Sequence, residues 1–283
     1  MLSKNVETFI ACDCEYNDAK TVIFGAPFDS TTSFRPGTRF ASSAMRSESF
    51  GIETYSPYQN KDLEDINVFD SGDIELCIGD TNKVLEQIEE RTRIILNDGK
   101  RPMMIGGEHL VTLGAFRVAA ERYPDIHIIH FDAHADLRED YLGVKLSHAC
   151  VLRRCWDIIG DDRIHQFGIR SGERAEFEFA KIHTDMHPFS LEDVSGVVKE
   201  LGKKPVYFTL DLDVLDPSIF PGTGTPEAGG VTFEELRRAV TNVCSSLNIV
   251  ACDVNELSPH YDASGVSTAA ACKIVREILL AVD

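Results

Sequence analysis

The stretch DIHIIHFDAHADL, residues 125–137, places a hydrophobic run directly before a cluster of acidic and imidazole side chains. Asp132, His134 and Asp136 occupy every second position after that run. Because an extended backbone directs alternate side chains to the same side, these three groups can leave the end of a strand on one face and converge. A buried strand has no need of such a cluster, whereas a metal ion does. We therefore predict a strand that ends in a metal site.

Three other segments place polar groups directly after an apolar run. These groups are His109 after Pro102–Ile105, Asp211 and Asp213 after Val206–Leu210, and Glu256 after Ile249–Cys252. In open α/β sheets, ligands bind at the carboxyl ends of the strands. All four segments therefore predict one site at the same edge of a sheet.

Short apolar runs alternate with longer helical patterns along the chain. The expected strands are Thr21–Gly25, Asn67–Asp70, Pro102–Ile105, Ile126–Phe131, Arg163–Ile169, Lys181–Thr184, Val206–Leu212 and Ile249–Asp253. The expected helices are Lys83–Leu96, Leu110–Tyr123, Phe233–Leu247 and Gly265–Leu280, and Thr232 with Glu235 predicts a capping box. This alternation predicts an α/β protein with a mainly parallel sheet and helices on both faces.

Composition narrows the class of protein. The chain has 283 residues, 43% of them hydrophobic, and no Pro-, Ser- or Gly-rich linker divides it, so we expect one domain over residues 1–283. A net charge of −18 argues against nucleic acid and is compatible with a cationic substrate. No apolar run approaches the ~20 residues of a membrane span, and no signal peptide is evident. We expect a cytoplasmic protein without a membrane partner, whose eight cysteines are reduced and mostly buried.

Six side chains form the predicted metal-binding set: His109, Asp132, His134, Asp136, Asp211 and Asp213. Two imidazoles and four carboxylates without a thiolate suit manganese or, less selectively, iron, cobalt or nickel, rather than structural zinc. Four carboxylates carry too much negative charge for one divalent ion, so charge balance favours two ions that share bridging carboxylates. Two such ions lower the pKa of a bound water molecule, which predicts metal-assisted hydrolysis.

Taken together, the motifs resemble the ureohydrolase family of arginases, agmatinases and their relatives. The resemblance rests on GGEH, HFDAHAD, FTLDLDVLDPSIFPGTGTPEAGG, DVNELSP and the opening segment GAPFDSTTSFRPGTRFASSAMR, and it spans nearly the entire chain. It implies a three-layer α/β/α, arginase-like domain with a mainly parallel eight-stranded sheet. It also implies two Mn²⁺ ions per chain and a homo-oligomer, either a trimer or a hexamer.

The resemblance implies a role for each residue of the site. One manganese would be held by His109, Asp132, Asp136 and Asp211, and the second by Asp132, His134, Asp211 and Asp213. A bridging hydroxide would attack the central carbon of a guanidinium group, and the intermediate would collapse to urea and an amine. Asp136 would carry the proton to the leaving nitrogen, Glu256 would pair with and orient the guanidinium, and His148 would act as a proton shuttle.

The expected substrate is a small guanidinium cation. Arginases carry an asparagine where this chain has Arg138, and the loop 137–147 contains no Asn, so the sequence is more similar to agmatinases. This implies conversion of agmatine to urea and the polyamine putrescine. Glu173 is the expected substrate-binding acid for the distal amine, with Glu227 and Asp29 as other candidates. Arg138 leaves a guanidinobutyrase as an alternative function, because a cation at the mouth of the active site suits a substrate that carries a carboxylate. In the other interpretation, Arg138 points outward and pairs with neighbouring acids.

Hypotheses from other classes also remain. A one-zinc deacetylase on the same scaffold is disfavoured by the paired LDLD and the additional His109. A non-catalytic binding relative is disfavoured because all six ligands and Glu256 are present. A mononucleotide-binding protein is disfavoured because neither GxGxxG nor GxxxxGK[ST] occurs.

Overall fold

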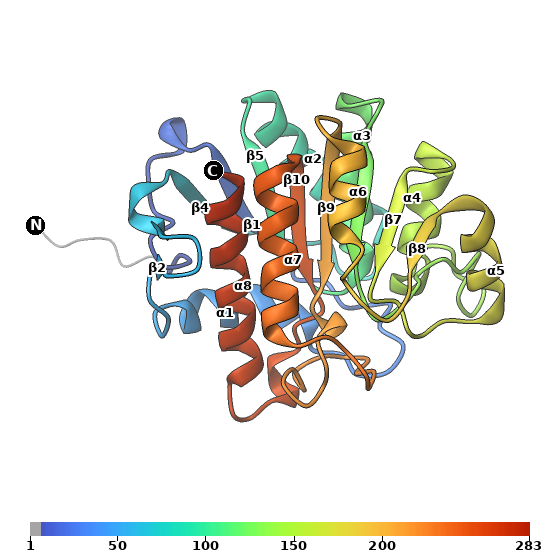
Figure 1. Cartoon of the computed structure of the whole chain (residues 1–283). Coiled ribbons are helices and arrows are strands. Elements are labelled where there is room, and N and C mark those ends of the chain that lie inside the picture. The colour runs from blue at the N-terminus through green and yellow to red at the C-terminus, as the bar shows by residue number, and fades with distance from the viewer. Residues whose placement is uncertain (1–6) are drawn as a thin grey trace, which may run out of the picture.

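A computed structural model describes residues 7–283, and its centre is a sheet of eight strands (Figure 1). The strands are β1 (Thr21–Gly25), β4 (Val68–Asp73), β5 (Arg101–Ile105), β6 (His127–Phe131), β7 (Ile164–Phe167), β8 (Asp185–His187), β9 (Pro205–Asp211) and β10 (Asn248–Asn255). Their order is β4-β1-β5-β10-β9-β6-β7-β8, and all neighbours run parallel. A separate antiparallel pair joins β2 (Tyr55–Ser56) to β3 (Lys61–Asp62).

Helices cover both faces of the sheet, which confirms the predicted three-layer arrangement (Figure 1). One layer consists of α1 (Ala41–Ser49), α6 (Val194–Leu201), α7 (Phe233–Ser246) and α8 (Val266–Val282). The other consists of α2 (Thr81–Asn97), α3 (Thr112–Arg122), α4 (Val151–Ile159) and α5 (Arg174–His183). Side chains of β1 alternate between the two cores, with Ile23 in the first and Val22 and Phe24 in the second. Strands buried on both faces explain the nearly continuous apolar runs in the sequence.

Most expected elements are present with ends shifted by a few residues, and the capping box of Thr232 and Glu235 is formed. The strand expected at Lys181–Thr184 is wrong. Residues 181–183 end α5, and the edge strand β8 begins only at Asp185. In helix α5, Ala180 is buried in the core and Ile182 is 71% exposed. The apolar residues of this segment therefore do not form a buried strand but belong to a helix with one buried face. Within residues 7–283, no helix is long and apolar enough to cross a membrane.

The loops that follow the strands gather at one edge of the sheet, the lower edge in Figure 1. The four strands at the centre, β5, β10, β9 and β6, are direct neighbours. These are the strands after which the sequence places its acidic and imidazole groups. Segments up to 147 residues apart, such as those of His109 and Glu256, are thereby brought into contact.

Candidate metal centre

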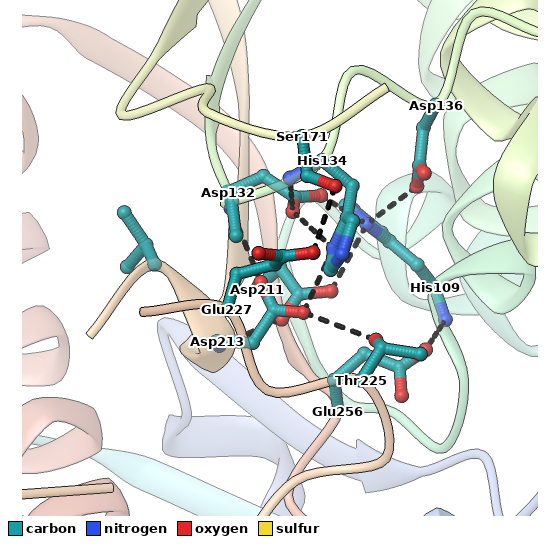
Figure 2. Close-up of polar contacts among 12 residues, drawn as sticks. His109, Asp132, His134, Asp136, Ser171, Asp211, Asp213, Thr225, Glu227 and Glu256 are labelled. Carbon is teal, nitrogen blue, oxygen red and sulfur yellow. Dashed lines mark hydrogen bonds and ion pairs between the residues drawn. The ribbon is translucent and has the colours of Figure 1, made fainter. Parts of the chain in front are cut away.

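The six predicted ligands converge at the carboxyl ends of β5, β6 and β9 (Figure 2). His109 opens the turn after β5, Asp132 directly follows β6, Asp211 ends β9, and Asp213 lies in the turn after it. All of the six are buried except His134, whose side chain is 24% exposed. Residues 132–136 bring their groups to one place together with two segments that are distant in the sequence, but the extended backbone predicted here ends at Phe131, and Asp136 has a left-handed backbone.

His109 directs its Nδ1 toward carboxylates. Its Nε2 lies 2.9 Å from the hydroxyl of Thr209, and that hydroxyl donates to Asp253 Oδ1 at 2.6 Å. Since the Thr209 hydroxyl is already a donor, His109 Nε2–H must donate to it, which leaves Nδ1 as the ring nitrogen available to a ligand. Nδ1 lies 3.0 Å from Asp132 Oδ2 and 3.2 Å from Asp136 Oδ2, and although burial opposes it, these carboxylates raise the pKa of His109 well above its ordinary value. A proton or a metal ion must therefore lie between Nδ1 and the carboxylate oxygens, and the donor set fits a metal ion.

The second imidazole of the set has a similar environment. His134 Nδ1 lies 3.0 Å from Asp213 Oδ2 and 3.5 Å from Asp132 Oδ1. The coordinating atoms of these three residues lie within 4.8 Å of one another, which is close enough for one ion to contact all of them. Asp132 also reaches His109, so its two oxygens face the two halves of the cluster.

His130 is a functional residue that the sequence interpretation did not assign. The side-chain amide of Gln166 donates to His130 Nδ1 at 3.1 Å, so the proton is on Nε2, which donates to Asp132 Oδ2 at 2.8 Å. His130 therefore orients Asp132 rather than offering a lone pair of its own. Its position two residues before Asp132, on the same face as the ligands, is the signal in the sequence that could have identified it.

The electrostatics of the cluster are unfavourable without a cation. Burial and then repulsion by Asp132 raise the pKa of Asp136 to about 7. Burial and then repulsion by Asp213 raise the pKa of Asp211 well above its ordinary value. Among residues 7–283, the ion-pair partners of these acids are histidines, and no lysine or arginine neutralises them. Divalent cations would stabilise the ionised carboxylates that the fold has gathered here.

Two of the candidate catalytic residues adopt a left-handed backbone. Asp136 has φ 53° and Glu256 has φ 65°, a region that is unfavourable for residues with a side chain. The carbonyl of Asp136 accepts the backbone N–H groups of Leu152 and Arg153 at the start of α4, both at 3.1 Å. Glu256 is fully buried, and its Oε1 accepts the N–H of His109 at 2.7 Å. Strained backbone of this kind concentrates at functional sites, and here it aims two carboxylates at the cluster.

His148 is held at the mouth of the site by the loop after β1. Its backbone N–H donates to Thr31 Oγ1 at 3.1 Å, while its buried Nε2 has no partner. Thr31 in turn donates its N–H, at 2.8 Å, and its hydroxyl to the buried carboxylate of Glu108. The sequence interpretation assigned no role to Glu108 or Thr31, because their contacts join segments 77 residues apart.

A pocket of about 270 Å³ opens above the cluster, and its lining includes His134, Asp136, Arg138, Tyr141, His148 and Glu173. Of the three acids considered for the distal amine, only Glu173 lines this pocket. Asp29 is paired with Arg39 at 2.8 Å, and Glu227 accepts the hydroxyl of Ser171 at 2.9 Å. The alternative that Arg138 pairs with an acid next to it in the sequence, Glu139 or Asp140, is wrong, because Arg138 Nη1 donates to Glu173 Oε1 at 2.7 Å.

Known proteins are similar to this chain over nearly its whole length. Residues 19–281 match the model of the arginase family. An agmatinase of Bacillus subtilis is 46% identical over 278 residues, which cover 97% of this chain and 96% of the relative. A guanidinobutyrase of Pseudomonas aeruginosa is 33% identical over 269 residues, 90% of this chain and 84% of the relative. A crystal structure of a provisionally assigned agmatinase from Clostridium difficile has a TM-score of 0.93 and 53% identity, and covers 95% of this chain and 98% of that one.

Proposed function

The chain belongs to the arginase family, and on that premise we propose that it hydrolyses agmatine to putrescine and urea. It is an agmatinase-like ureohydrolase, an enzyme that cleaves C–N bonds of linear amidines. The observation that carries the proposal is the position of His109 Nδ1, which faces three carboxylates in a buried cluster at the floor of a pocket. Relatives at 46% identity that are agmatinases support the choice of substrate.

We assign the cluster to two divalent ions, with manganese as the metal. His109, Asp132, Asp136 and Asp211 would hold one ion, and Asp132, His134, Asp211 and Asp213 the other. When bound, the two ions supply Lewis acidity, which makes water a nucleophile near neutral pH. His130 and Thr209 keep Asp132 and His109 in the orientation that this binding requires.

The reaction adds water to the central carbon of the guanidinium group and breaks the bond from that carbon to the alkylated nitrogen. The leaving nitrogen takes a proton, so that urea and an alkylammonium ion form. We propose that Glu256 pairs with the guanidinium and orients it, because its buried carboxylate lies beside the cluster and is fixed through His109 N–H. Asp136 would transfer the proton to the leaving nitrogen, since its carboxylate lines the pocket beside His109.

His148 is the residue that we propose to carry protons between the pocket and solvent. It lines the pocket, its Nε2 is free of hydrogen bonds, and its backbone is fixed by Thr31. Burial and then the nearby His134 lower the pKa of His148 to about 4, so the imidazole is neutral at neutral pH.

A comparison of substrates tests the proposal. Purified protein loaded with Mn²⁺ is supplied with agmatine, arginine or 4-guanidinobutanoate at equal concentrations, and urea is measured over time. We expect the highest kcat/KM with agmatine. A preference for 4-guanidinobutanoate would identify a guanidinobutyrase, the alternative that Arg138 favours. Absence of urea from all three substrates would reject the function.

Manganese as the metal in the cell, the cytoplasmic location, the trimer or hexamer and the extent of the catalytic domain over residues 1–283 stay predictions. Metal analysis of protein purified without added metal tests the identity of the metal. Light scattering of the purified protein measures its mass and so tests whether it is a trimer or a hexamer. Activity of protein trimmed at either end tests the domain boundaries.

A further inference from the structure

An ion pair stands at the mouth of the pocket, away from the metal-binding groups. Arg138 Nη1 lies 2.7 Å from Glu173 Oε1, and the carbon at the centre of the Arg138 guanidinium lies 4.8 Å from the centre of the Tyr141 ring. The side chains of Arg138 and Glu173 are 26% and 58% exposed. Both residues line the pocket that also contains Asp136 and His148. A substrate whose guanidinium lies at the floor therefore directs its other end toward this pair.

Glu173 is the acid of the pocket mouth that can be released. Glu176 also lines the pocket, but its carboxylate is buried and already accepts the backbone N–H groups of Glu173, at 2.7 Å, and Leu137, at 2.9 Å. Those bonds anchor the start of α5, so Glu176 has a structural role. The side chain of Glu173 pairs with Arg138 at 2.7 Å and also accepts the N3 backbone N–H of α5 in a capping box, while it stays 58% exposed.

The pair excludes neither charge, because both partners are neutralised: Glu173 by Arg138, and Arg138 by Glu173 at 2.7 Å and by the buried Glu176 at 3.5 Å. A bound ammonium group must take Glu173 from Arg138, and a bound carboxylate must take Arg138 from Glu173. Partly exposed ion pairs contribute only about 0.2–1 kcal/mol, so the pair can open when a substrate offers a replacement. The partner that stays behind remains next to the substrate and repels a group of its own sign.

We propose that Arg138 and Glu173 together select the charge at the far end of the guanidino substrate. Glu173 binds the distal ammonium of agmatine, and Arg138 is a specificity-determining residue that competes for Glu173 and weakens agmatine binding. Removal of the Glu173 charge releases Arg138 to accept a carboxylate, so a preference for guanidino acids lies one substitution away. The proposal rests on the proposed function, because it assumes hydrolysis of a guanidino substrate at the pocket floor.

Two neutral variants of similar shape test the proposal. Arg138→Gln is expected to lower KM for agmatine about fivefold, the effect of about 1 kcal/mol, with little change in kcat. Glu173→Gln is expected to lower the ratio of kcat/KM for agmatine to that for 4-guanidinobutanoate at least about fivefold. Matched controls are Arg174→Gln and Glu178→Gln. They remove one positive and one negative charge at exposed positions of α5 that do not line the pocket.

The outcomes separate this inference from the function on which it rests. If the unmodified enzyme releases urea from neither substrate, the proposed function fails. If it is active but the ratio in Arg138→Gln and Glu173→Gln moves no further than in the controls, the selectivity proposal is overturned. Metal content and thermal unfolding verify that each variant is folded. Glu173→Gln alone suffices if Arg138→Gln does not fold, because Glu173 is the more exposed partner.

Discussion

Two acidic clusters lie on the same sheet and differ in where their compensating charge comes from. The buried Asp70 and the exposed Asp73, both in β4, are paired with the buried guanidinium of Arg46, whose Nε lies 2.8 Å from Asp70 Oδ2. Four aspartates at the ends of β6 and β9 have only histidines as ion-pair partners among residues 7–283. The first cluster is complete within the chain, and the second requires cations from outside.

The difference teaches how a functional site can be distinguished from a structural ion pair. Burying a carboxylate is unfavourable unless it is paired and hydrogen-bonded. A fold that only needed stability would supply an arginine, as it does at Asp70. Buried acids that have only histidine ring nitrogens as partners are therefore a signature of binding.

The largest expected effect comes from the cluster that depends on external charge. Asp132→Asn removes a proposed bridging carboxylate and should lower kcat a thousandfold or more, on the order of 4 kcal/mol, together with most of the bound metal. The variant should stay folded, since it removes a buried negative charge. Two ions per chain in this variant by metal analysis would contradict the bridging role.

A substitution in the cluster that Arg46 neutralises should change the stability of the protein rather than its activity. Arg46→Met leaves Asp70 without its partner and should lower the free energy of unfolding by about 3 kcal/mol, measured by urea denaturation. Arg93→Met, which breaks the exposed pair with Glu121, is the control and should cost less than about 1 kcal/mol. Equal effects of the two variants would mean that burial does not distinguish these pairs.

His148 lines the pocket but is not a proposed metal ligand, so its substitution should change activity without changing metal binding. His148→Ala should slow turnover about a hundredfold through the loss of proton transfer, while both ions stay bound. Turnover and metal content are measured on the same preparation. A normal rate would assign His148 a packing role.

The orientation of His109 in the metal-binding cluster provides a test with a smaller expected effect. Thr209→Val keeps the shape of the side chain but removes the hydroxyl that accepts from His109 Nε2. Metal affinity should fall about ten- to a hundredfold, measured by competition with a chelator. Unchanged affinity would show that the ring needs no such partner.

Metal removal should change how stability depends on pH. In the metal-free cluster, burial and then repulsion by Asp132 raise the pKa of Asp136 to about 7, against about 4 in an unfolded chain. The folded metal-free protein thus binds this proton more tightly than the unfolded chain, and its stability falls as pH rises through about 7, on the order of 1 kcal/mol. Urea midpoints at pH 6.5 and 8 should differ without metal and converge with Mn²⁺. A midpoint that rises with pH in the metal-free protein would contradict the sign.

The sequence predicts well which acidic and imidazole side chains gather at one edge of the sheet, and their role as metal ligands stays a prediction. The gathering is predictable because the edge of a parallel sheet brings distant strand ends together. The role of His130 could not be predicted, because its tautomer depends on Gln166 of the neighbouring strand. The partner of Arg138 was missed for a similar reason, since Glu173 lies 35 residues away while two acids are adjacent in the chain. Four residues at 181–184 were too few to distinguish a strand from the end of a helix.

The left-handed backbone at Asp136 and Glu256 bears on how this enzyme could be engineered. A residue with a side chain is strained there, so glycine at either position would relieve the strain. A search for heat-resistant variants would therefore favour substitutions that abolish the two carboxylates on which turnover is proposed to depend. Thermostability and activity are opposed at these two positions, and designs that aim for both should hold them fixed and seek improvement elsewhere.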